Sequence, residues 1–98
     1  MAWFAVRSVI RFDEVFEERV VLFSATGADA AIARAEVEAA GYVESLGSGV
    51  VLDFQQSYEL AEERIEDATE LFSLMRTSEL DSATYLSTHF NTGAEHQQ

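Results

Sequence analysis

The sequence predicts an α+β fold in which one long helix packs on one face of a four-stranded antiparallel or mixed sheet. The prediction depends on an alternating apolar and polar run near the N-terminus, a long segment with apolar residues at helical spacing, and glycines that separate it from another alternating run. The expected chain order is strand, strand, helix, strand, strand and a short C-terminal helix. We assign residues 1–90 to a single domain and residues 91–98 to a flexible tail.

Alternation from Trp3 to Phe12 predicts the first strand. One of its faces is apolar except for Ser8. That face carries Phe4, Val6, Ile10 and Phe12. An acidic stretch at 13–18 then leads into β-branched and aromatic residues at 19–25, which predict a second strand and complete a hairpin.

A helix is predicted from Thr26 onward, because its hydroxyl can cap the first amides and Asp29 favours the positive helix start. Apolar residues follow at helical spacing. They are Ile32, Ala35, Ala39, Tyr42, Val43 and Leu46. Gly47 and Gly49 end the helix, and alternation at 50–58 predicts a third strand.

Two interpretations compete for residues 59–76. Apolar residues at spacings of three and four favour a helix, whereas the run at 69–75 reads as a fourth strand after an acidic turn. Beyond this segment, Asp81 or Ser82 can cap a short helix. That helix would carry Leu80, Ala83, Leu86 and Phe90.

Four stretches of the chain resemble the DUF4288 family of small uncharacterised bacterial proteins. They are Trp3-Phe4-Ala5-Val6-Arg7, the run from Glu17 to Phe23, the run from Asp29 to Glu36, and the run from Glu66 to Ser73. The resemblance implies a turn leading into a strand at 69–76. Ala68 occupies the turn position where the family usually has glycine, and alanine is strained at positive φ. The family brings no established activity, cofactor or catalytic residue.

The charge of the chain limits its partners. Eighteen acidic residues stand against six arginines and no lysine, which gives a net charge of −12. A field of this sign repels polyphosphate backbones, so we expect no binding to nucleic acid. The apolar N-terminal run is too short to span a bilayer, and the absence of cysteine suits a reducing compartment. We therefore expect a cytoplasmic protein without membrane contact.

No motif for catalysis, cofactor or metal binding is present in the sequence. The carboxylates at 59–70 crowd an expected loop or exposed helix face, where charged side chains are usually solvated. His89 and His96 are seven residues apart, which is not a helical ligand spacing. We expect a protein that is not an enzyme and has no cofactor or metal site. The alternative is an enzyme or small-ligand binder that uses Asp53, Tyr58 or Tyr85 in a cleft.

The apolar residues predict an interface, because they exceed what one helix can cover. The candidates are Trp3, Ala5, Val9, Val21, Phe23, Leu71 and Met75. We expect a protein-interaction module that forms a homodimer through an apolar sheet face, unless the C-terminal helix covers that face. An acidic immunity or inhibitor protein that binds a basic partner is the alternative.

Overall fold

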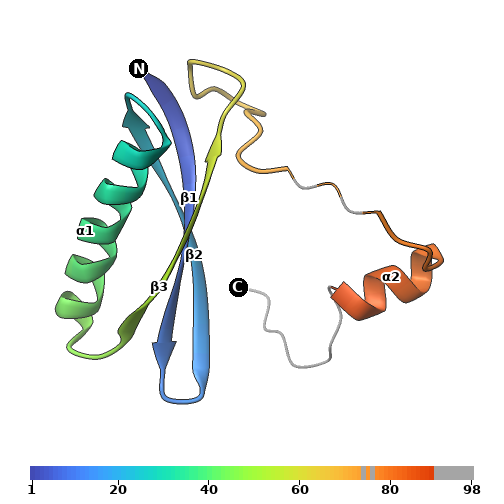
Figure 1. Ribbon diagram of the computed structural model, residues 1–98, viewed down its shortest axis with the longest axis horizontal. Coiled ribbons are helices and arrows are strands. Elements are labelled where there is room, and N and C mark those ends of the chain that lie inside the picture. The colour runs from blue at the N-terminus through green and yellow to red at the C-terminus, as the bar shows by residue number, and fades with distance from the viewer. Residues whose placement is uncertain (74, 76, 90–98) are drawn as a thin grey trace.

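The structure is a computed structural model that describes residues 1–73, 75 and 77–89. Its elements are β1 (Ala2–Phe12), β2 (Val15–Ala25), α1 (Ala28–Leu46), β3 (Val50–Glu59) and α2 (Ser82–His89) (Figure 1). The fold is α+β, with an antiparallel three-stranded sheet and two helices. The predicted tail at 91–98 lies outside the described residues.

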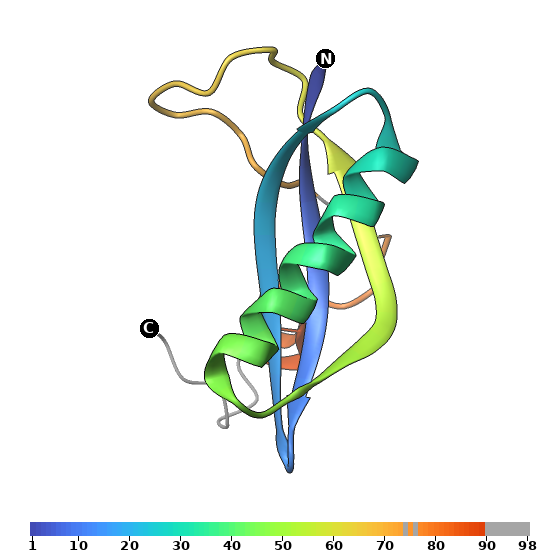
Figure 2. The same cartoon turned by 90° about the vertical axis from the view of Figure 1, so that its left-hand side faces the viewer.

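The sheet has the order β2-β1-β3, and β1 pairs antiparallel with both neighbours. As a result β2 and β3 run parallel to each other on either side of β1, and α1 connects them across one face (Figure 2). Only Asp13 and Glu14 separate β1 from β2, and Asp13 adopts a positive φ of 54°. The hairpin loop is therefore two residues long, and β2 begins four residues before the predicted start at residue 19.

Both ends of α1 depend on glycine rather than on a capping side chain. The predicted Thr26 cap is wrong: the N-cap is Gly27, whose backbone is extended and which has no side-chain cap. At the other end Gly47 adopts a φ of 73°, and its N–H donates to the carbonyls of Val43 and Glu44. This left-handed C-cap satisfies carbonyls at the helix end and turns the chain toward β3.

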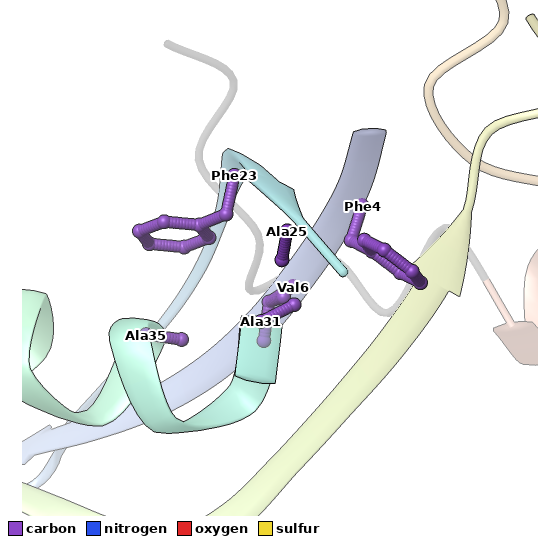
Figure 3. Close-up of a cluster of buried hydrophobic side chains, with 6 residues drawn as sticks. All are labelled: Phe4, Val6, Phe23, Ala25, Ala31 and Ala35. Carbon is purple, nitrogen blue, oxygen red and sulfur yellow. The ribbon is translucent and has the colours of Figure 1, made fainter. Parts of the chain in front are cut away.

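A stripe of alanines lets α1 lie close to the sheet. Ala31, Ala35 and Ala39 are at most 2% exposed and face the buried residues of the strands. The core cluster consists of Phe4, Val6, Phe23, Ala25, Ala31 and Ala35 (Figure 3). Val6 and Ile10, on the predicted apolar face of β1, have the largest fully buried side chains. The core is thus a single layer between α1 and the sheet.

The chain beyond β3 continues alongside β1 and then leaves the sheet. Leu60 is 3% exposed, and its N–H donates to the Trp3 carbonyl at 2.9 Å. Ala68 adopts a φ of 68°, the positive value that favours glycine at the turn. The described residues of the segment 69–76 form neither the predicted strand nor the competing helix. In the part of the chain that the structure describes, the sheet therefore has three strands where four were predicted.

Candidate interaction surface

The face of the sheet opposite α1 carries no helix, and we call it the open face. The strand registers place on it Trp3, Ala5, Arg7, Val9, Arg11, Phe16, Glu18, Val20, Leu22, Val50, Gln56 and Tyr58. Phe16 and Val20 are 54% and 52% exposed. Side chains of this size and exposure on one sheet face form the kind of surface that binds other proteins.

Three of the predicted interface residues, Trp3, Ala5 and Val9, lie on the open face. Val21 and Phe23 do not, which corrects their predicted position. The hairpin register pairs Val21 with Val6 and Phe23 with Phe4, so both point toward α1. Phe23 is 6% exposed in the core cluster, and Val21 packs against that cluster.

The segment after β3 contacts the open face through Phe72. Its ring meets the Tyr58 ring edge to face, with centroids 5.6 Å apart. The Tyr58 hydroxyl lies 3.4 Å from a carboxylate oxygen of Glu70, and burial together with that charge raises the pKa of Tyr58 above its usual value. Leu71 and Met75, the predicted interface residues of this segment, are 45% and 93% exposed.

A small apolar cavity lies where this segment crosses the sheet. Its volume is about 220 Å³, and it is lined by Ala5, Arg7, Glu18, Val20, Gln56 and Phe72. Arg7 forms an ion pair with Glu18 there. Arg11, farther along β1, places its guanidinium 5.0 Å from the Phe16 ring centroid. The open face thus combines exposed apolar side chains with two cations from the central strand.

The alternative cleft is not assembled from its predicted residues. Asp53 lines a depression of about 280 Å³ together with Glu36 and Gln55, whereas Tyr58 packs on Phe72. Tyr85 lies in α2, beside Leu80 and Leu86. The three residues proposed for acid-base or ligand chemistry therefore occupy separate surfaces.

A polar network on the α1 side was not predicted from the sequence. Arg19 donates two hydrogen bonds of 2.9 Å to the Glu38 carboxylate, and its guanidinium lies 3.7 Å from the Tyr42 ring centroid. The Tyr42 hydroxyl donates to Glu17 at 2.9 Å. The hydrogen bond to Glu38 raises the pKa of Arg19, and the one to Glu17 raises the pKa of Tyr42. The network fixes α1 against β2.

Replacing Arg19 by methionine is expected to lower the free energy of unfolding by about 1–3 kcal/mol, because Glu38 loses a bidentate partner at a part-buried site. Arg64→Met is the matched control: its exposed pair with Glu66 spans 3.8 Å, so we expect a change within about 0.5 kcal/mol. Urea unfolding of both variants measures the difference. Equal losses would show that the network contributes no more than a surface pair.

Three further properties were compared with known patterns: groups of metal ligands, membrane-spanning helices and similarity to known proteins. Within residues 1–73, 75 and 77–89, no three acidic or histidine side chains form a group that could hold a metal ion. None of the described helices combines the length and apolar character needed to cross a membrane. Searches of protein-family models, curated proteins and solved structures found no match. The resemblance to DUF4288 stays a prediction.

Proposed function

We propose that the chain is a non-enzymatic, cytoplasmic protein-interaction module that forms a homodimer through the open face. The observation that carries this proposal is the exposure of Phe16 and Val20 beside the apolar cavity of the open face. Burying apolar surface contributes about 25 cal/mol per Å², and a second copy presents the same surface about a twofold axis. The open face is thus suited to self-association.

The described part of the chain covers the open face only in part: Ala5 is 2% exposed and Trp3 and Val9 are half-buried, whereas Phe16 and Val20 are exposed. Phe72 reaches it, but α2 contacts neither the strands nor α1. Figures 1 and 2 show α2 on the side of the sheet opposite α1, standing away from the strands. Among residues 1–73, 75 and 77–89, α2 therefore provides none of the intramolecular cover that was the competing expectation.

The proposal includes a fourth strand formed by residues 69–76 once the face is covered. The contact between Tyr58 and Phe72 supports it, because it brings Phe72 to a residue of β3; to pair, the segment would have to move from the open face, where Phe72 lines the cavity, to the free edge of β3. Pairing there would also protect an edge strand whose backbone groups are otherwise available to other chains.

The substitution Val20→Glu tests the proposed interface. It is expected to weaken dimerisation at least tenfold, because a carboxylate at a protein interface must lose water, and Arg7, the cation directly across the strand pair, is already paired with Glu18. Val15→Glu is the matched control, since Val15 lies on the same strand, is 64% exposed and faces away from the open face. Sedimentation equilibrium gives both dissociation constants. Equal constants for the two variants would remove the open face from the interface.

A second candidate is an inhibitor that binds a basic protein. The acidic residues between β3 and α2 support it: Glu62, Glu63, Glu66 and Asp67 are all exposed. Binding of this kind weakens steeply as salt screens the charges, whereas an apolar interface keeps its affinity. The salt dependence of association therefore separates the two candidates.

A further inference from the structure

The segment after β3 reaches the open face without secondary structure. Leu60 anchors its start, because it is buried and its N–H donates to the Trp3 carbonyl. Residues 61–73 follow, and we call them the strap. All of them are exposed except Thr69, which is half-buried, and none belongs to a helix or strand. Figure 1 shows the strap, in yellow and orange, on the side of the sheet opposite α1, so it lies on the side of the proposed interface.

One aromatic contact holds the strap on the sheet. Every hydrogen bond and ring contact that joins the strap to the sheet goes to Tyr58. The Phe72 ring meets the Tyr58 ring edge to face, and Glu70 lies 3.4 Å from the Tyr58 hydroxyl, which is long for a hydrogen bond between two oxygens. The other hydrogen bonds of the strap are internal, at a turn formed by residues 66–69. A segment held in this way can leave the sheet without disturbing the core.

Charge does not hold the strap on the sheet. The strap carries five carboxylates and one arginine, in a chain of net charge −12. The arginines of the open face have other partners, because Arg7 pairs with Glu18 and Arg11 donates to the Asp13 carbonyl. Both the strap and the rest of the chain are acidic, so their overall electrostatic interaction opposes closure.

A second copy on the open face needs the position that Phe72 occupies. Phe72 lines the cavity of about 220 Å³ together with Ala5 and Val20. Ala5, in the central strand, is 2% exposed, whereas Val20 of β2 is 52% exposed. The face is therefore shielded at its centre and open toward β2. Two packed sheets lie about 10 Å apart, and their own side chains fill that gap, so no room remains for the strap between them.

Resting on the homodimer proposed above, we infer that the strap is autoinhibitory: it closes on the open face of the single chain through Phe72 and leaves that face when two copies pair. Each copy must open its strap before it dimerises, so closure lowers the apparent affinity in proportion to the fraction of open chains. Release also frees the strap to reach the edge of β3, the movement that the proposed fourth strand requires.

The substitution Phe72→Ala tests the strap. Losing an edge-to-face ring pair shifts an equilibrium by about two- to tenfold, and a dimer needs two open straps, so we expect the dissociation constant to fall by about 4- to 100-fold. Ile65→Ala is the matched control, because Ile65 lies in the strap, is 42% exposed like Phe72 and does not line the cavity. Its dissociation constant should be unchanged. Sedimentation equilibrium measures both, and an unchanged or weaker dimer for Phe72→Ala overturns the inference.

Nuclear magnetic resonance on the original chain gives a second readout. The nuclear Overhauser effect between the Tyr58 and Phe72 rings is expected in the monomer at low protein concentration, because their centroids are 5.6 Å apart. The effect should disappear in the dimer. Its persistence there would place the strap inside the interface and overturn the inference.

The outcomes separate the strap from the homodimer. If the original chain dimerises and Phe72→Ala pairs no more tightly, the homodimer stands and the strap is wrong. If only Phe72→Ala dimerises, the strap is right and closes too tightly for the original chain to pair. If both chains are monomeric at every concentration, the homodimer is wrong, and the inhibitory role of the strap is wrong with it.

Discussion

Replacing Ile10 by alanine is expected to lower the free energy of unfolding by about 2–5 kcal/mol. Ile10 is 0% exposed in the central strand, where it pairs with Glu17 of β2 and Val51 of β3. The truncation removes buried methyl groups and leaves a cavity that the two flanking strands cannot close. Because small domains have a total stability of about 5–15 kcal/mol, the variant should be largely unfolded in moderate urea.

Val37→Ala is the control for the Ile10 prediction, because Val37 is 75% exposed on α1. We expect a change within about 0.5 kcal/mol for this variant. Urea unfolding followed by circular dichroism gives both values. A loss below about 1 kcal/mol for Ile10→Ala would mean that β1 is not the centre of the core.

The second large effect is expected from filling the alanine stripe of α1. Ala39 is 0% exposed against the sheet, so leucine at this position must push the helix away from the strands. Overpacking of this kind costs about 1–3 kcal/mol. The neighbouring Ala40 is exposed, and Ala40→Leu adds the same side chain without a steric conflict. The two variants therefore differ in where the leucine points and in nothing else that governs helix formation.

Thermal unfolding of the two leucine variants measures this difference. For a chain of this length, each 1 kcal/mol corresponds to a shift of about 4–8 °C in the unfolding midpoint. We expect Ala39→Leu to unfold several degrees below Ala40→Leu. Identical midpoints would show that α1 does not lie as closely on the sheet as the structure indicates.

Local patterns predicted those elements whose burial follows a simple period. The alternation from Trp3 to Phe12 identified the central strand and its buried face, and the apolar spacing through Ala35 and Ala39 identified α1. The segment 59–76 carries both helical and strand patterns. Local preference therefore could not determine its structure: Glu59 is the last residue of β3, and the described residues from Leu60 onward adopt neither conformation.

The residues that were misplaced depend on contacts between distant parts of the chain. Val21 and Phe23 were expected on the interface, but the face of a strand is set by its register. The register follows from the two-residue loop of Asp13 and Glu14. The acidic stretch 13–18 looks like a longer loop in the sequence, so the start of β2 was predicted too late. The pairing of Arg19 with Glu38 likewise joins a strand to a helix, so no local spacing signals it.

The central claim is that the chain forms a homodimer through its open face. Size-exclusion chromatography with light scattering on the original chain tests this claim most directly. The measurement compares about 0.1 M with about 1 M salt, where the screening length falls from about 10 Å to about 3 Å. An apolar open-face dimer predicts twice the chain mass of 10.9 kDa at both salt concentrations. A mass of 10.9 kDa at both concentrations, or a dimer that dissociates in high salt, would contradict the claim.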